Sequence, residues 1–429
     1  MEAVKIQHRP IWAWVIILIA SSYFFYEFIQ MNMVGSLADS FESTFHLTSF
    51  QLSLIACFYF LSDSILLYPA GALLDYFSSK TIMMIGMIMC VLGTYLITFA
   101  TNSWFLVGAR FLAGTASAFC LLSILRLAAQ WFPAKRLGLV SGVIVAIGML
   151  GGAFAQQPLS LMISRVNWRW ALHIVGLMGI FFLILIFFFV KDAPMRHRHA
   201  ALQTDDGIKT QGWLEVLLKV IKNKNNWLAG LYTSTMNLPI MILAGLFGTQ
   251  LVQQETGATE LHASWASTMI FIGTIFGSLV FGLASDGFKS RKQPMLWAAV
   301  LSIIEIVYII YTPHLSANAY ILLFFIMGFI TSAQILGYPV IREVNPGVMV
   351  GAALGFISVL IMVLPTFLQP LTGWLLQKDW HSVYVDGGVP FYTVIEYNRI
   401  FWVIACGFVV SILCVFFLPE TYGRTGERE

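Results

Sequence analysis

Hydrophobic residues dominate twelve stretches of this chain, separated by short polar connections. The stretches cover about residues 11–37, 49–74, 81–100, 103–130, 137–163, 169–190, 226–252, 263–284, 294–312, 319–341, 348–376 and 399–418. A helix needs roughly 20 apolar residues to cross ~30 Å of hydrocarbon, and each stretch is about that long or longer. The sequence therefore predicts an all-α membrane protein with twelve transmembrane helices, and the lipid bilayer is its first partner.

One long polar stretch, at about 191–225, separates the sixth run from the seventh. It carries many basic residues and predicts a linker with a short interfacial helix at about 213–221. The chain is thus expected to have three parts: a six-helix bundle at 1–190, a cytoplasmic linker at 191–225, and a second six-helix bundle at 226–429 that ends in a short tail.

Composition excludes several classes of function. Of the 429 residues 59% are hydrophobic and only 10% are charged, which leaves little room for a soluble catalytic domain, so we expect no enzyme. The 24 basic and 21 acidic residues nearly balance, so no nucleic-acid partner is expected. The 5 cysteines lie in apolar runs without Cys-x-x-Cys spacing. We therefore expect no metal site and no cofactor, and the chain has no phosphate-binding loop for ATP.

The positions of Lys and Arg predict the orientation, because basic residues near helix ends are retained in the cytoplasm. With the N-terminus inside, most of the 24 basic residues fall in cytoplasmic connections or in the linker. The outer connections then hold only Arg165, Arg169, Lys378 and Arg399. Both termini are therefore expected on the cytoplasmic side.

An internal repeat divides the chain into two related halves. The stretch GALLDYFSSK begins at Gly71 and GLASDGFKSRK begins at Gly282, 211 residues later. Gln157-Pro158-Leu159 recurs as Gln369-Pro370-Leu371 at nearly the same separation. Two parallel repeats with the same starting side are the arrangement expected of a transporter that moves two bundles around a central site.

At these residues the chain resembles the major facilitator superfamily of transporters. The two Gly-led stretches are similar to its loop signature, which implies a gating motif comprising Gly71, Asp75, Lys80, Gly282, Asp286 and Arg291. The first copy departs from the pattern, because Tyr76, Ser78 and Ser79 stand where the family usually has basic residues or glycine. RFLAGTASA around Arg110 and the glycine-rich fifth run resemble two further signatures. Each motif alone is also typical of plain helix packing.

A finer resemblance concerns YFFYEFIQMN at 23–32 and NWRWAL at 167–172, which are similar to phagosomal nutrient transporters of intracellular bacteria. The resemblance implies a monomer in a bacterial inner membrane that imports a small polar solute, such as an amino acid or a nucleoside, with protons. The alternatives are transport of a siderophore, an organic anion or a drug-like compound, in either direction, and a nutrient sensor that does not transport.

Ionisable residues within the apolar runs are candidates for coupling, because a charge in hydrocarbon costs at least ~2.5 kcal/mol. Glu27, Asp63 and Arg110 lie in the first half, and Glu305 lies in the second. At 1.5 Å per residue, Glu27 and Arg110 come at similar depths. They are expected to form an ion pair or to share a substrate site; alternatively, Arg110 only bonds to the backbone of the first helix.

The expected substrate-binding residues are polar or aromatic side chains on runs that should face the centre: Tyr23, Glu27, Gln30, Arg110, Gln157, Tyr232, Asn237, Gln334, Tyr338 and Gln369. The positions that the repeat relates to Glu27, Asp63 and Arg110 are Leu238, Thr274 and Ile321. Charge recognition is therefore expected in the first half only. The Asn-Leu-Pro sequence at 237–239 predicts a break in the seventh helix.

Overall fold

The computed structural model describes residues 10–192 and 213–422, apart from 313, 379, 381–382 and 386–388. The side chains at 68, 71–72, 75–76, 134–135, 213–214 and 348 also lie outside the described part. Within it, 12 helices are long and apolar enough to cross a membrane. The prediction of an all-α membrane fold with twelve spans is confirmed.

The first half forms one bundle of helices. Its elements are α1 (Pro10–Asn32), α2 (Val34–Phe45), α3 (Ser49–Tyr76), α4 (Ser79–Thr98), α5 (Ser103–Trp131), α6 (Ala134–Phe154), α7 (Gln157–Val166) and α8 (Trp168–Phe189). The side chains of Thr48, Ser78 and Asn102 accept hydrogen bonds from first-turn amides of α3, α4 and α5, which fixes where these helices begin. The fifth span consists of α6 and α7 with a break between them, which the apolar pattern did not predict.

The second half contains more irregular helix. Its elements are α11 (Trp213–Lys222), α12 (Lys224–Met236), the π-helix η2 (Pro239–Phe247), α13 (Gly248–Thr256), α14 (Glu260–Gly287), α15 (Lys292–Tyr311), α16 (Ala317–Thr331), the 3₁₀-helix η3 (Ser332–Leu336), α17 (Gly337–Val344), the 3₁₀ turn η4 (Gly347–Met349), α18 (Val350–Gln377), β1 (Tyr384–Val385), β2 (Val389–Pro390) and α19 (Val394–Phe417). The break expected near Pro239 is the start of η2. The twelfth span begins before the predicted 399, because Thr393 and Glu396 form a capping box.

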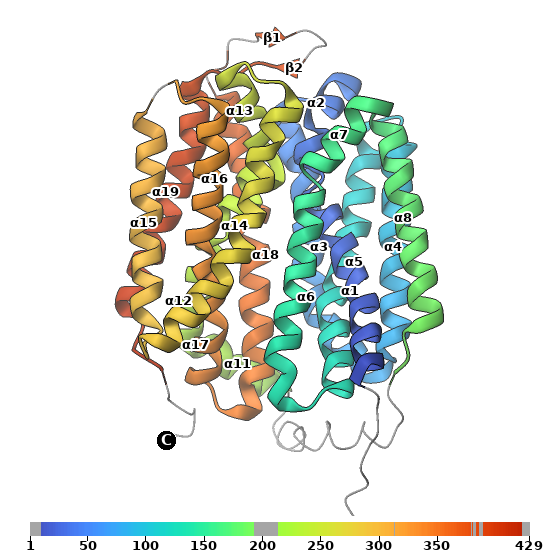
Figure 1. Cartoon of the computed structure of the whole chain (residues 1–429), viewed down its shortest axis with the longest axis vertical. Helices are drawn as coiled ribbons and strands as arrows, with labels where there is room; N and C mark the ends of the chain where they lie inside the picture. The colour runs from blue at the N-terminus through green and yellow to red at the C-terminus, as the bar shows by residue number, and fades with distance from the viewer. Residues whose placement is uncertain are drawn as a thin grey trace, which may run out of the picture.

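The two bundles stand side by side in Figure 1, with their helices roughly parallel to the long axis. We call one end the hairpin face, because the antiparallel hairpin of β1 and β2 lies there with α2, α7 and α13. The opposite end is the linker face, where α1 begins, α19 ends and α11 lies (Figure 1). Across the interface between the halves, α3 packs against α18, α6 against α14, and α1 and α2 against η2.

Candidate functional site

Glu27 of α1 is buried between three helices of the first half. One oxygen of its carboxylate, Oε1, accepts hydrogen bonds from the Tyr59 hydroxyl in α3 and from Ser117 Oγ in α5, the latter at 2.8 Å. Only 2% of Glu27 is exposed. The residue therefore joins α1, α3 and α5 through hydroxyl donors, at the place where the sequence predicted a functional carboxylate.

Asp63 follows Tyr59 by one helical turn on α3 and is also buried. It interacts electrostatically with Glu27 and with the Ser117 hydroxyl, and its Oδ1 has no hydrogen-bond partner among the described residues. The structure thus brings together two carboxylates that the sequence had not paired. Ser117 lies between them, so that a proton on either carboxylate has a hydroxyl within reach.

Arg110 of α5 does not form the expected ion pair. Its Nη1 donates to the carbonyl oxygen of Gln30, and its Nη2 donates to that of Met31 at 3.2 Å. No ion pair between Glu27 and Arg110 is present in the described part of the chain. The guanidinium lies 4.6 Å from the ring centre of Tyr59, whose hydroxyl bonds to Glu27. Arg110 therefore bonds to the backbone of α1 in this conformation, and its role in coupling or substrate binding stays a prediction.

Two glutamines support helix breaks at corresponding places in the two halves. Gln156, in the break between α6 and α7, donates from Nε2 to the carbonyl oxygen of Asn32 at the end of α1, at 3.0 Å. Gln369 of α18 donates from Nε2 to the carbonyl oxygen of Met241 in η2, at 2.8 Å. Ser36 Oγ in turn donates to Ala155 O at 2.8 Å, so the breaks in spans one and five hold each other.

Gln157 was the predicted partner of Gln369, and the structure moves that role by one residue. The Gln157 side chain is partly exposed at the start of α7, and its backbone N–H donates to Thr268 Oγ1 of α14 at 3.1 Å. Gln156 is fully buried instead. In this conformation Gln156, not Gln157, contacts the end of α1, and a substrate-binding role of Gln157 stays a prediction.

The other predicted substrate-binding residues of the first half, Tyr23 and Gln30, are buried and hydrogen-bonded to other helices. The Tyr23 hydroxyl donates to Ala116 O at 2.6 Å, so it ties α1 to α5. Gln30 Nε2 donates to Thr94 Oγ1 of α4 at 2.7 Å, while its Oε1 has no partner in the described chain. Of these two side chains, Gln30 retains a free hydrogen-bonding atom.

The predicted substrate-binding residues of the second half are buried or partly buried among the helices of that half. Tyr232 of α12 donates its hydroxyl to Met295 O of α15 at 3.2 Å. Asn237 is 5% exposed and caps the end of α12, where the break begins. Gln334 in η3 is 9% exposed, and Tyr338 is partly buried in α17. Tyr232 thus joins α12 to α15 in this conformation, and its role in substrate binding stays a prediction.

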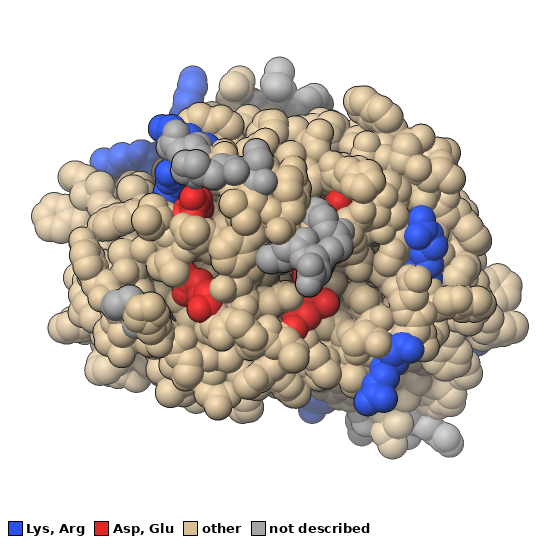
Figure 2. All heavy atoms as spheres, turned by 90° about the horizontal axis from the view of Figure 1, so that it is seen from above, with Lys and Arg blue, Asp and Glu red and all other residues tan. Residues whose placement is uncertain are grey.

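The hairpin face closes the gap between the halves. Gln250 Nε2 of α13 donates to Asp39 Oδ1 at 2.8 Å and to Glu42 Oε2 at 2.7 Å, both in α2 of the other half. A Cβ on Gly35 would lie 3.2 Å from the backbone of Gly245, so α2 and η2 touch closely. Figure 2 views this face and shows acidic side chains in its middle and basic ones nearer the rim.

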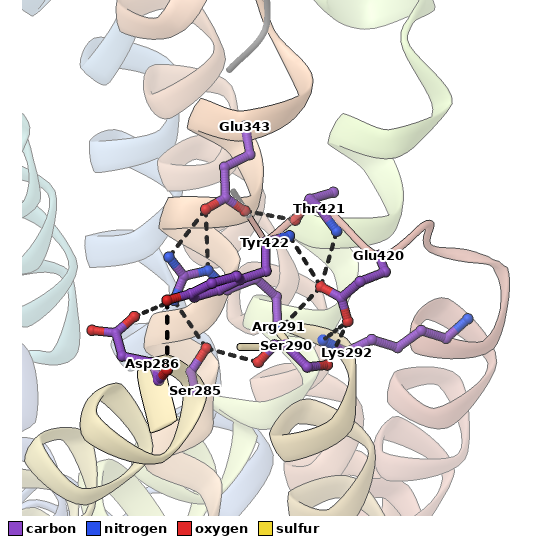
Figure 3. Close-up of polar contacts among 9 residues, drawn as sticks. All are labelled: Ser285, Asp286, Ser290, Arg291, Lys292, Glu343, Glu420, Thr421 and Tyr422. Carbon is purple, nitrogen blue, oxygen red and sulfur yellow. Dashed lines mark hydrogen bonds and ion pairs between the residues drawn. The ribbon is translucent and has the colours of Figure 1, made fainter. Parts of the chain in front are cut away.

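The linker face of the second half is held by a cluster centred on Arg291, shown in Figure 3. Its Nη2 donates to Glu343 Oε1 and its Nη1 to Asp286 Oδ1, each at 3.0 Å. Glu420 accepts hydrogen bonds from Ser290 Oγ and from the Arg291 amide. Burial alone would raise the pKa of Glu420, but these and further backbone donors outweigh it and lower that pKa to about 2.

The predicted gating residues divide between described and undescribed side chains. Asp286 and Arg291 pair as the motif implies, within the second half. Lys80 donates to Phe187 O of α8 at 2.6 Å. A Cβ on Gly282 would meet nothing within 4 Å. The side chains of Gly71 and Asp75 lie outside the described part. The hydrogen bonds between the halves described above all lie on the hairpin face, so this conformation is closed there.

These features are those of a multi-pass membrane transporter: 12 helices able to span a membrane, buried polar side chains within them, and, among the described residues, hydrogen bonds between the halves on the hairpin face. The sequence pattern of the Major Facilitator Superfamily matches residues 16–251 and 233–428. The chain therefore belongs to the Major Facilitator Superfamily, and its transport function and its place in the membrane follow from that.

Known relatives are distant. The "Uncharacterized transporter YybO" of Bacillus subtilis (strain 168) is 25% identical over 66% of this chain and 67% of its own length. The "Membrane sensor protein UhpC" of Escherichia coli (strain K12) is 24% identical over 77% of this chain and 78% of its own length. Several other relatives are matched over less than two thirds of their length. A solved D-xylose-proton symporter has a TM-score of 0.73 at 16% identity and covers 96% of this chain and 99% of that one.

Proposed function

We propose that this protein imports a small polar solute together with protons, by alternating access across a bacterial inner membrane. The observation that carries the proposal is the buried carboxylate of Glu27, which is held by hydroxyl donors and is not paired with Arg110. The fold is shared with a solved D-xylose-proton symporter, which supports proton coupling. The protein is expected to act as a monomer.

The physical argument is that a proton on Glu27 removes the cost of an uncompensated charge inside the membrane. Opening the central region to water on one side lets that proton leave. Asp63 and Ser117 lie next to Glu27 and offer it a path. Movement of the two halves then changes which side exchanges protons with Glu27, and this couples the proton gradient to transport.

The proposed orientation places the linker face in the cytoplasm, because most basic residues of the connections lie there. This conformation would then be open to the cytoplasm. Single cysteines replacing Ser43 and Gly347, on a background without the native cysteines, test the orientation with a membrane-impermeant reagent in intact cells. Ser43→Cys should be labelled and Gly347→Cys should not; the reverse pattern contradicts the orientation.

Glu27→Gln is the decisive variant for coupling, because it keeps size and hydrogen bonding but cannot titrate. In proteoliposomes it should lose uptake driven by a pH gradient and keep exchange of solute at equal concentrations. Glu305→Gln is the matched control, since Glu305 is another buried carboxylate but lies in α15 of the other half. If exchange and gradient-driven uptake fall together, Glu27 binds the solute instead. Full pH-driven uptake by Glu27→Gln rejects proton carriage.

For the solute, the resemblance of residues 23–32 and 167–172 to phagosomal nutrient transporters favours an amino acid or a nucleoside. A second candidate function is a membrane sensor, because a relative with that name matches 77% of this chain. Counterflow of labelled solute in proteoliposomes separates the two functions. A transporter accumulates label against its gradient, and a sensor binds the solute without moving it.

A further inference from the structure

Four buried amide side chains have a carbonyl oxygen without a hydrogen-bond partner in the described part of the chain. They belong to Gln30 and Asn32 of α1, Gln156 between α6 and α7, and Gln369 of α18. Each residue is at most 2% exposed. Buried polar atoms in proteins are nearly always hydrogen-bonded, so a group of unpaired ones requires an explanation.

The orientation of these amides is fixed by what their nitrogens contact. Gln156 and Gln369 donate from Nε2 to backbone carbonyl oxygens, which can only accept. Gln30 donates to Thr94 Oγ1, and the Thr94 hydroxyl itself donates to Cys90 O at 3.1 Å. Exchanging oxygen and nitrogen in any of these three amides would place two acceptors together. Asn32 likewise donates from Nδ2 to the carbonyl oxygen of Phe28, at 2.9 Å, so all four unpaired atoms are acceptors.

Asn32, Gln156 and Gln369 are linked to the end of α1 or to η2, and Gln30 of α1 is linked to α4 through Thr94. Asn32 Oδ1 is 3.1 Å from the place that a Cβ on Gly245 would occupy. Gly245 comes one turn after Met241, whose carbonyl holds Gln369 from the second half. Asn32 from one half and Gln369 from the other thus flank the same segment of π-helix. Glu27 precedes Gln30 by about one turn of α1, so the acceptors continue toward the carboxylate.

We propose that these amide oxygens bind the transported solute, and that this solute therefore carries several N–H or O–H donors. The inference rests on the proposed transport function and adds the chemical class of its substrate. A solute without donors leaves the oxygens unpaired and is rejected for that reason. Arg110 Nε, a buried donor without a partner in the described residues, leaves a place for one acceptor atom of the solute. Amino acids and nucleosides have this mixture of groups.

Matched pairs of solutes test the donor requirement on the unmodified protein. Binding is measured by tryptophan fluorescence on the full chain in lipid nanodiscs, with two pairs: glycine against glycine betaine, and uridine against tri-O-methyluridine. Each second member keeps the charge or the ring but has lost the amine or ribose donors. The donor-bearing member of the pair that binds should bind at least about tenfold more tightly, as expected for two or more hydrogen bonds. Equal binding within that pair, or binding of the acceptor-only dianion succinate alone, overturns the proposal.

Substitutions at Gln369 separate ligand binding from support of the helix break. Gln369→Met should weaken binding of the donor-bearing solute about three- to tenfold, and Gln377→Met, on the same helix, should not change it. Gln369→Glu keeps acceptor oxygens but loses the N–H that holds Met241, so it should retain affinity if the free oxygen binds the solute. Loss of affinity in Gln369→Glu equal to that in Gln369→Met assigns Gln369 to support of η2 alone and rejects its binding role.

Counterflow distinguishes failure of this inference from failure of the proposed function. If the reconstituted protein transports none of the five solutes, the importer of amino acids or nucleosides fails together with the donor requirement. If it transports succinate or glycine betaine as well as their donor-bearing counterparts, transport stands and the donor-selective site is rejected.

Discussion

Glu42→Gln should reduce the pH dependence of closure at the hairpin face to the part that Asp39 contributes. Glu42 is completely buried in α2, and its two oxygens accept hydrogen bonds from Ser49 Oγ at 2.8 Å and from Gln250 Nε2 at 2.7 Å. Burial raises the pKa of Glu42 to about 8, against the effect of these hydrogen bonds and with a contribution from the nearby Asp39 carboxylate. Because Gln250 belongs to the other half, opening of this face removes its bond and lets water reach Glu42.

The sign and size of the effect follow from the two pKa values. In the closed state Glu42 keeps its proton up to about pH 8, and in the open state its pKa returns toward the ordinary 4.5. Between these values the closed state binds one proton more, so each unit of rising pH lowers the ratio of closed to open about tenfold. From about pH 6 to about pH 7.5 the ratio should fall about 24-fold, because the slope already decreases as the pH approaches 8. Above about pH 8 this contribution is lost.

Neighbouring titratable groups leave this direction unchanged. Burial also raises the pKa of Asp39, which bonds to the same amide of Gln250, so Asp39 adds to the preference for closure at low pH. Burial raises the pKa of Tyr392, which lies over this cluster, to about 12, so its hydroxyl stays neutral across the range. Two further titratable groups lie near this cluster. Glu260 of α14 interacts electrostatically with Asp39, and Tyr397 of α19 interacts with Glu42 and Asp39.

The distance between the halves reports closure directly. Spin labels are placed on cysteines at Thr44 in α2 and Ile395 in α19, and the distance between them is measured by pulsed electron resonance in nanodiscs. The fraction of molecules with the closed-state distance should be larger at about pH 6 than at about pH 7.5. In Glu42→Gln the change in this fraction with pH should be smaller than in the wild type, because only Asp39 still contributes. Glu396→Gln is the control, since Glu396 bonds to Thr393 within its own half. A Glu42→Gln protein with the full wild-type pH response, or a wild-type response of opposite sign, would refute the reasoning.

Two further substitutions test the packing of the site. Gly373→Val should open the hairpin face, because a Cβ there would lie 2.7 Å from Ser49 O across the interface, whereas Gly355→Val on the same helix meets nothing within 4 Å and should leave the spin-label distance unchanged. Arg110→Lys should lower thermal stability by about 1–3 kcal/mol, because one ammonium cannot hold both carbonyls of α1. Its residual transport should keep the wild-type pH profile; a shifted profile would instead assign Arg110 to proton coupling.

The sequence predicts the twelve spans well because their length and hydrophobicity are local properties. The breaks are different. Pro239 predicts the break in span seven, because proline lacks a backbone hydrogen-bond donor. The interruption at Met33 has no such residue, and its carbonyls are satisfied by Arg110 and Gln156 from other helices. A break that depends on partners far along the chain leaves no local pattern to find.

The site shows the same limit. The sequence predicts a pair between Glu27 and Arg110 because the two residues come at similar depths in the membrane. Depth gives only one of the three coordinates that a contact requires. The ring of Tyr59 lies against the guanidinium of Arg110, and the Tyr59 hydroxyl donates a hydrogen bond to the carboxylate of Glu27. Asp63 lies one turn from Tyr59 on α3 and interacts electrostatically with Glu27, so a third helix contributes to the site. The Gln-Gln dipeptide at 156–157 did offer the correct residue, and only the helix break decides which of the two is buried.

The two repeats have similar glutamine side chains that bond to the backbone at helix breaks, but the buried charges of the first half have no counterparts at the related positions of the second half. Gln156 and Gln369 hold corresponding breaks, yet the position related to Arg110 is Ile321, which cannot bind a carbonyl. The second half compensates with nine residues of π-helix in η2, which redirect backbone hydrogen bonds without a cation. Since a fixed charge is needed neither to support η2 nor to close against α2, we infer that Glu27 in the first half carries the proton.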